Sequence, residues 1–273
     1  MPDCPIDAEI DAGTATADRI LADRTAFAER TRRGILVAEG DSWFDYPGAD
    51  LLEVLQDDAG WEVASAAHWG DSLESMAYDD AQLTAFVRQL EWVKGRDEVP
   101  AAVLLSGGGN DFAGPEFGVF VGHQRSRRPG VDVALTDDFI GCRMLSVFFN
   151  IVAVVTRVCE TLFGARIPIL VHGYDYPVPD GRGFLSGWGP LPGPWLAPSL
   201  DRKNFTDLAE KKQIAAGIVD RYNDMLAEFV QRPTSAHVSY VDLRGTLSTG
   251  DNYRDYWANE LHPTGRGCDL LAA

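Results

Sequence analysis

The chain has 273 residues, with 41 acidic side chains against 24 lysines and arginines, so its formal net charge at pH 7 is −17. Hydrophobic residues make up 45% of the chain and charged residues 24%, a globular composition that excludes an intrinsically disordered protein. The acidic balance disfavours nucleic acids and anionic membrane surfaces as partners, because both attract basic side chains. A chain of this length can bury a sizeable core as one unit.

The first 33 residues are expected to lie outside the main fold. A loose arm precedes a predicted helix from Thr14 to Arg33, and residues 34–273 are expected to form the rest of a single domain. The arm and helix lack the apolar segment of a secretory signal. The most apolar stretch, 144–156, is shorter than the ~20 residues that span a bilayer and predicts a buried helix. We therefore expect a cytoplasmic protein without a membrane span.

Residues that could bind a metal or a nucleotide are scattered along the chain. The four cysteines include no CxxC pair, which predicts neither a disulfide scaffold nor a zinc site. The histidines also lack metal-ligand spacing, and no G-x-G-x-x-G or P-loop sequence follows a predicted strand. We therefore expect no metal and no nucleotide cofactor.

Short apolar runs alternate with amphipathic helices along the rest of the chain. The predicted strands are Ile35–Ala38, Glu62–Ala66, Ala101–Ser106, Ile167–Val171 and His237–Val241. The predicted helices include Leu51–Leu55, Asp80–Lys94, Asp138–Phe163 and Phe205–Val230. Such alternation is typical of a parallel sheet covered by helices on both faces. We therefore predict a three-layer α/β/α fold around a five-stranded parallel sheet.

Two long segments without a predicted element interrupt this pattern. Residues 112–137 carry three arginines inside an otherwise acidic chain, and residues 172–203 are rich in glycine, proline and aromatic side chains. Structureless loops of this length are uncommon in compact domains and often serve as lids or binding loops. Ordinary variation of surface loops is the alternative interpretation.

Polar residues and glycines collect directly after the predicted strands. In a parallel sheet, ligands bind beyond the carboxyl ends of the strands, and Ser42, Gly70, Asn110 and His262 all follow different strands on that edge. A serine nucleophile requires a base and donors for the oxyanion. His262 can supply the base, Gly70 an unobstructed backbone N–H, and Asn110 a side-chain amide. A serine in such a turn, taken alone, is more often a helix cap.

Taken together, these segments resemble the SGNH/GDSL hydrolase superfamily. Gly40–Ser42 resembles its first block, Gly70–Ser72 its second, and Gly108–Asp111 its GxND third block. His262 with Pro263 resembles the last block, and all four occur in the family's order. The resemblance implies a flavodoxin-like sheet, no metal, and esterase or lipase chemistry through an acyl-enzyme.

The resemblance also implies roles for individual residues. Ser42 corresponds to the nucleophile and His262 to the base. The backbone N–H groups of Ser42 and Gly70, with the side-chain amide of Asn110, correspond to the oxyanion hole. The implied partner is a small-molecule, carbohydrate or lipid ester, and the sequence does not distinguish among these.

One position departs from the family's pattern. The last block normally reads DxxH, and here Asn259 stands where the triad aspartate is expected. An asparagine can orient an imidazole by a hydrogen bond, but it carries no charge to stabilise the imidazolium. Two geometries are open: Asn259 accepts the ring N–H with its own NH₂ tied elsewhere, or it points away and another group orients His262. A catalytically weakened or inactive binding protein of the same fold is the alternative function.

Overall fold

The computed structural model describes residues 14, 15, 17–19, 33–184 and 192–273. Residues 14, 15 and 17–19 are helical. The rest of the predicted arm and helix, within residues 1–32, lies outside the described residues. The division of the chain at residue 33 therefore stays a prediction.

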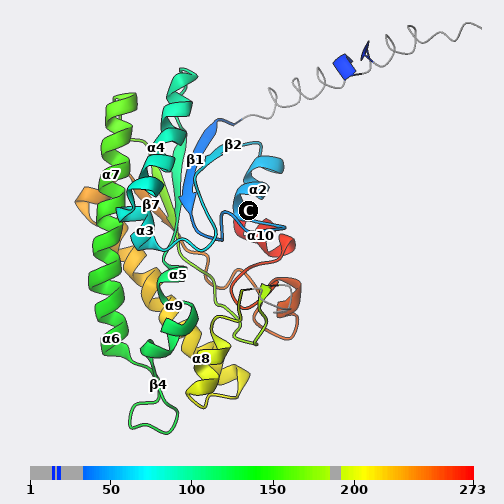
Figure 1. Ribbon diagram of the computed structural model, residues 1–273, viewed down its shortest axis with the longest axis vertical. Helices are drawn as coiled ribbons and strands as arrows, with labels where there is room; N and C mark the ends of the chain where they lie inside the picture. The colour runs from blue at the N-terminus through cyan, green and yellow to red at the C-terminus, as the bar shows by residue number, and fades with distance from the viewer. Residues whose placement is uncertain (1–13, 16, 20–32, 185–191) are drawn as a thin grey trace, which may run out of the picture.

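Five parallel strands form the central sheet. They are β1 (Ile35–Gly40), β2 (Glu62–Ser65), β3 (Ala102–Ser106), β6 (Ile169–His172) and β7 (Val238–Val241). Their order is β2-β1-β3-β6-β7 (Figure 1). β1 and β3 are buried along their whole length because they lie inside the sheet, whereas β2 and β7 at the edges keep partly exposed residues. The predicted sheet is confirmed, and no strand end moves by more than two residues.

Helices cover both faces of this sheet, so the predicted three-layer arrangement is also confirmed. α2 (Leu51–Asp57) and α10 (Gly265–Ala272) lie on one face (Figure 1). The other face is covered by α3 (Leu73–Tyr78), α4 (Asp80–Gly95), α7 (Leu145–Phe163) and α9 (Leu208–Val230). The short helices α3 and α10 were not expected, although each begins after a hydroxyl side chain that caps its first turn, Ser72 for α3 and Thr264 for α10.

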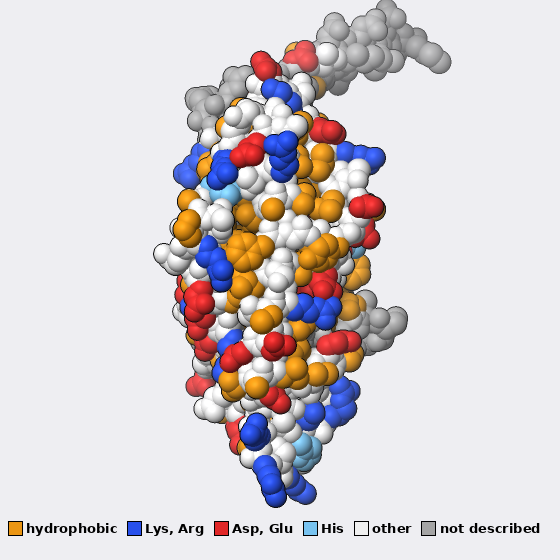
Figure 2. Space-filling view, turned by 90° about the vertical axis from the view of Figure 1, so that its left-hand side faces the viewer, with side chains coloured by type: hydrophobic (Ala, Val, Ile, Leu, Met, Phe, Trp, Pro, Cys, Tyr) orange, Lys and Arg blue, Asp and Glu red, His pale blue; other side chains and the backbone are white. Residues whose placement is uncertain are grey.

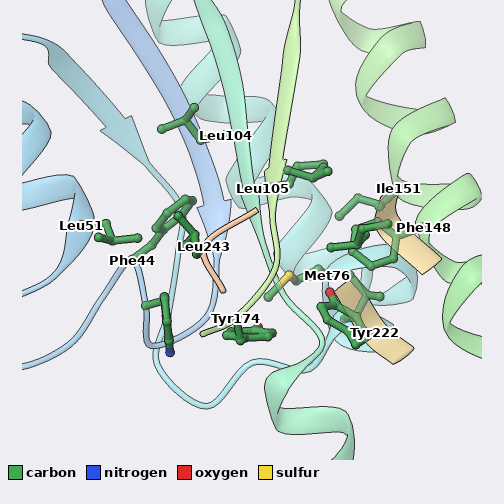
Figure 3. Close-up of a cluster of buried hydrophobic side chains, with 14 of the residues drawn as sticks. Phe44, Leu51, Met76, Leu104, Leu105, Phe148, Ile151, Tyr174, Tyr222 and Leu243 are labelled. Atoms are coloured by element: carbon green, nitrogen blue, oxygen red, sulfur yellow. The ribbon is translucent and has the colours of Figure 1, made fainter. Parts of the chain in front are cut away.

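The hydrophobic core has two parts, one on each face of the sheet. Consecutive residues of a strand point to opposite faces, and in Figure 3 Leu104 of β3 points toward Leu51 while Leu105 points toward Ile151 of α7. Tyr222 of α9 is fully buried in the second part, where its ring lies 5.6 Å from that of Tyr174. This packing fixes the carboxyl ends of β3 and β6 and so positions the polar residues that follow these strands.

The segment 112–137 is not the structureless loop that the sequence predicted. It contains the end of α5 (Gly109–Phe112), the 3₁₀ helix η1 (Gly114–Phe120), the hairpin of β4 (Val121–Gly122) and β5 (Gly130–Val131), and α6 (Val133–Asp138). These elements are too short to give a clear periodic pattern, which is why they were missed. The three arginines of this segment lie exposed in the turn of the hairpin.

The second long segment contains one helix, α8 (Ala197–Arg202), within its described residues. Residues 173–180 before it are nearly all buried although they form neither helix nor strand. The expectation of a structureless loop is therefore wrong for residues 197–202, and any lid function stays a prediction.

Helix α7 continues from α6 through the π-helical turn η2 (Phe139–Met144). Among the described residues, this helix of residues 133–163 is long and apolar enough to cross a membrane by length and composition, a test that core helices of soluble proteins also pass. Val147, Phe148, Ile151 and Val155 face the core. Figure 2 views the molecule from the side of α7 and shows hydrophobic side chains interspersed with charged ones. A membrane span is therefore not supported.

The buried carboxylate of Glu260 holds the segment around α8 against the end of the chain. It is fully buried and accepts four backbone N–H groups. Oε1 accepts from Gly181 and Ala197 at 3.0 Å each, and Oε2 from Trp195 and Leu196 at 2.6 and 2.7 Å. A buried carboxylate is tolerated here because these N–H groups replace its hydration shell.

We predict that Glu260→Gln lowers the free energy of unfolding by about 1–3 kcal/mol, because the new NH₂ group faces buried N–H donors and leaves them without an acceptor. Chemical denaturation followed by tryptophan fluorescence measures this change. The exposed Glu91→Gln on α4 is the matched control and should be neutral. Equal stabilities of the two variants would contradict the anchoring role of Glu260.

Candidate active site

The carboxyl ends of β1 and β3 lie side by side, which brings the segments that carry Ser42 and Asn110 close together. The backbone N–H of Asp41 donates to the carbonyl of Ser106 at 3.0 Å. A Cβ atom at Gly40 would lie 2.8 Å from the ring of Phe44 and 2.9 Å from Ser106, so only glycine permits this approach. Ser42 follows directly in a turn at the edge of the sheet.

Ser42, His262 and Asn259 form a continuous chain of hydrogen bonds. Nε2 of His262 lies 2.8 Å from Oγ of Ser42, and Nδ1 lies 2.9 Å from Oδ1 of Asn259. Oδ1 also accepts the backbone N–H groups of Leu261 and His262 at 2.9 and 3.0 Å, so it acts as an acceptor and Nδ1 carries the ring proton. Nε2 is then free to accept the proton of Ser42. A hydroxyl group in this position can attack an electrophile as it loses its proton.

Tyr46 binds the NH₂ group of the Asn259 side chain. Nδ2 of Asn259 donates to the hydroxyl oxygen of Tyr46 at 2.7 Å. The ring of Tyr46 also stacks on that of His262, with centroids 4.0 Å apart and planes inclined by 14°. Asn259 therefore faces His262 with its NH₂ tied to a third residue, which is the first of the two geometries that the sequence left open.

His262 is buried among aromatic rings and has no charged partner among the described residues that contact it. Besides Tyr46, the ring of Trp195 lies 5.2 Å away in an edge-on arrangement. Burial lowers the pKa of His262 from 6.5 to about 3, because the imidazolium would lose its hydration without gaining a counter-charge. The same burial raises the pKa of Tyr46 to about 12, so its hydroxyl stays protonated.

Three possible donors lie beside Ser42. Ser42, Gly70 and Asn110 line one cleft together with His262. The backbone N–H groups of Ser42 and Gly70 donate to no other described residue, and Gly70 has a φ of +91°, which favours glycine. The side-chain Nδ2 of Asn110 donates to the carbonyl of Asp71 at 2.9 Å, which leaves its second hydrogen available.

Two aspartates support these segments, Asp41, which is buried, and Asp111, which is half-buried. Asp41 accepts the backbone N–H of Trp43 at 3.0 Å and the hydroxyl of Ser106 at 2.9 Å, and the hydroxyl of Tyr174 donates to its other oxygen. Asp111 accepts the N–H of Leu73 at 2.7 Å, and burial raises its pKa to about 6. Asp41 thus joins the segments that follow three strands.

The structure brings together all five residues singled out from the sequence: Ser42, Gly70, Asn110, Asn259 and His262. Sequence reasoning missed Tyr46, and it singled out Tyr174 and Trp195 only as aromatic residues of the segment 172–203, without their contacts to Asp41 and His262. A tyrosine four residues after the serine and aromatic residues in a long loop carry no distinctive pattern, and only the spatial contacts identify them. Within the described parts of the chain, no group of three or more His, Cys, Asp or Glu residues could hold a metal ion.

No protein-family model matches the chain, and no curated protein matches it. Several solved structures are similar. An inhibitor-bound aryl esterase from M. smegmatis is 15% identical, with a TM-score of 0.46 over 88% of this chain and 95% of that one. Est24, a carbohydrate acetylesterase from Sinorhizobium meliloti, is 14% identical, with a TM-score of 0.44 over 88% of this chain and 95% of that one. A carbohydrate esterase of family 3 from Talaromyces cellulolyticus is 12% identical, with a TM-score of 0.40 over 88% and 92%. At these identities the likeness is one of fold alone.

We predict that the imidazole of His262 stays neutral down to about pH 4, because its pKa is lowered to about 3. Between pH 6.5 and about 3 the unfolded chain binds a proton at this position that the folded chain excludes. This group therefore lowers the stability of the folded state as the pH falls through that range. A proton NMR titration of the histidine ring signals, assigned with a His262→Gln variant, measures the pKa. A value near 6.5 would contradict the prediction.

Proposed function

We propose that the protein is a serine esterase that hydrolyses a carboxylic ester. The observation that carries this proposal is the hydrogen-bonded chain from Ser42 through His262 to Asn259, with 2.8 and 2.9 Å between successive polar atoms. These residues come from segments more than 200 positions apart in the sequence, and a helix cap would require no such convergence.

In the first half of the reaction, Ser42 is the nucleophile and His262 the base. Oγ of Ser42 bonds to the carbonyl carbon of the ester while its proton passes to Nε2 of His262. The carbonyl oxygen becomes an oxyanion, held by the N–H groups of Ser42 and Gly70 and by Nδ2 of Asn110. When the tetrahedral intermediate collapses, the bond to the alcohol oxygen breaks, and Nε2 returns the proton to that oxygen.

In the second half, water releases the acid from the acyl-enzyme. Nε2 of His262 takes a proton from water as the water oxygen attacks the carbonyl carbon, and then returns it to Oγ of Ser42. Because the free imidazole has a strongly lowered pKa, it is unprotonated at neutral pH and ready to accept a proton in each half-reaction. The oxyanion that forms nearby raises its basicity when the proton moves.

The alternative is an inactive protein of the same fold, for which Asn259 is the main argument. Asn259 holds the ring N–H of His262 at 2.9 Å and is itself held by Tyr46, so the orienting hydrogen bond does not depend on a carboxylate. This geometry favours an active enzyme. The proposed substrate is a small-molecule, carbohydrate or lipid ester.

We predict that a fluorophosphonate probe labels the protein at Ser42, because only an activated serine attacks the phosphorus atom. Mass spectrometry of the digested protein locates the label. Ser42→Ala should abolish labelling, whereas Ser72→Ala, which removes the cap of α3, should leave it intact. A label on Ser72 or no label on the native protein would refute the assignment of Ser42.

We predict that Asn259→Ala lowers kcat/KM at least 10-fold, equivalent to about 1.4 kcal/mol of transition-state stabilisation, because His262 loses its orienting acceptor. Asn259→Asp should stay active and should raise the pKa of His262, since a carboxylate would stabilise the imidazolium. As the pH is lowered, the rate of the Asn259→Asp variant should therefore begin to fall at a higher pH than the rate of the native protein.

The role of Tyr46 is checked in the same assay. Tyr46→Phe keeps the stacked ring and removes only the acceptor for Nδ2 of Asn259, so a 3- to 10-fold loss in kcat/KM is expected, about 0.7–1.4 kcal/mol.

A near-native kcat/KM of the Asn259→Ala variant would contradict the role of Asn259 and would show that another group orients His262.

A further inference from the structure

Two hollows meet at the nucleophile. The inner pocket has a volume of about 50 Å³ and the outer, aromatic cleft about 320 Å³. Ser42, Asn110, Leu261 and His262 line both. The reactive oxygen thus stands between a small space and a large one, as it must if the acid and alcohol parts of an ester lie on opposite sides of the carbonyl carbon.

The inner pocket is mainly apolar, and the residues that line it are buried or half-buried. Much of its wall consists of buried side chains from α5, η1, α9 and the residue before α8: Phe112, Phe117, Leu196, Ala215, Ile218 and Val219. The carboxylates of Asp41 and Asp175 also border it, but their oxygens already accept hydrogen bonds from the protein. The polar groups of Ser42, Asn110 and His262 lie where the reaction takes place, and the apolar remainder of the pocket binds an alkyl group in preference to water.

The volume limits the length of that alkyl group. An engineered apolar cavity of roughly 150 Å³ in another protein binds benzene, about 25 Å³ for each carbon atom. A pocket of about 50 Å³ therefore accepts about two carbon atoms. Longer chains would have to displace Ile218 or Phe117, which are 1% and 2% exposed and cannot move without disturbing the core.

The aromatic cleft is larger and reaches solvent. Four of its walls are the rings of Tyr46, Trp69, Phe184 and Trp195. Trp69 is 52% exposed, so the cleft opens to the surface at this side chain. Flat aromatic walls favour a ring through stacking and edge-on contacts. None of the described residues that line the cleft is charged.

The order of the chemical steps decides which part of the ester occupies which space. The alcohol leaves first, and water must then reach His262 while the acyl group stays bonded to Ser42. Trp69 and Gly70 in the wall of the aromatic cleft are exposed, whereas none of the residues that line the inner pocket is, so the alcohol leaves through the aromatic cleft. We propose that the inner pocket binds a short acyl group, acetyl or propionyl, and that the aromatic cleft binds an alcohol carrying an aromatic ring. This inference rests on the proposed esterase function.

Two isomeric esters test the assignment directly. Benzyl acetate has a small acyl group and a ring-bearing alcohol, whereas methyl phenylacetate has these sizes exchanged and a leaving alcohol of similar basicity. We expect kcat/KM to be at least 10-fold higher for benzyl acetate. A smaller or inverted ratio would overturn the assignment of the two spaces.

Two further substrates test the alcohol side. Benzyl acetate should be hydrolysed at least 10-fold faster than ethyl acetate, which lacks the ring. Faster hydrolysis of a monoacetylated methyl glucoside than of benzyl acetate would identify a sugar as the occupant of the cleft and would overturn the aromatic alcohol.

Substitutions on α9 test the acyl side with a matched pair. Ile218→Val enlarges the inner pocket by one methyl group, whereas Ile214→Val makes the same change at a buried position of α9 that does not line it. In a p-nitrophenyl ester series, Ile218→Val should raise the rate on butyrate relative to acetate at least 3-fold. Ile214→Val should leave the ratio unchanged, and equal ratios in both variants would refute the pocket.

Failure of this inference is distinguishable from failure of the proposed function. If both isomers are hydrolysed and Ser42→Ala abolishes both activities, the esterase function stands and only the division of the ester between the two spaces is at stake. If neither isomer nor any p-nitrophenyl ester is hydrolysed in a Ser42-dependent manner, both the function and this inference are overturned.

Discussion

The carboxylate of Asp41 holds the ends of three strands at one point, and the geometry of the site depends on it. It follows β1, accepts the hydroxyl of Ser106 at the end of β3, and accepts the hydroxyl of Tyr174 after β6. It also accepts the N–H of Trp43, which fixes the turn that carries Ser42. A buried carboxylate with this many donors is a rigid reference point, because each lost partner would leave buried charge exposed to an apolar surrounding. The N–H of Gly109 in turn donates to Tyr174, so the segment of Asn110 is tied to the same point.

His262 is held by a neutral hydrogen-bond acceptor and by aromatic rings, and not by a carboxylate. In a serine triad with an aspartate, the carboxylate both orients the imidazole and stabilises its charged form. Here Asn259 supplies the orientation, and Tyr46 and Trp195 enclose the ring. The consequence is a strongly lowered pKa, which keeps the imidazole unprotonated but makes it a weaker base. In the proposed esterase mechanism, such a base would depend more on the oxyanion for stabilisation of its charged form, and therefore on the donors of Ser42, Gly70 and Asn110.

Much of the fold was predictable because the spacing of hydrophobic residues within each segment indicates whether it forms a strand or a helix. The five apolar runs and the helices α4 and α9 repeat their hydrophobic residues over many positions, and their bounds were predicted to within three residues. The helix predicted from Asp138 to Phe163 covers η2 and α7 together. The hairpin of β4 and β5, with two residues in each strand, and the helices α3 and α10 are too short for such periodicity. The burial of the irregular segment 173–180 was not predicted either, since it involves partners far along the chain. The N–H of Val178 donates to the carbonyl of Glu260, and Asp175 accepts the N–H of Leu247.

The amino-acid sequence alone predicts the class of sheet and the edge at which polar groups gather, because strand periodicity and the direction of parallel strands follow from local hydrophobicity and chain connectivity. It also singled out Ser42 and His262, since a serine and a histidine after different strands of that sheet reach the same edge. The direction of the Asn259 amide and the sizes of the two spaces beside Ser42 can be seen only in the folded chain. Those features depend on the contacts of Tyr46, Trp195 and Ile218, which come from segments far apart in the chain, and no pattern within one segment encodes a distance between two others.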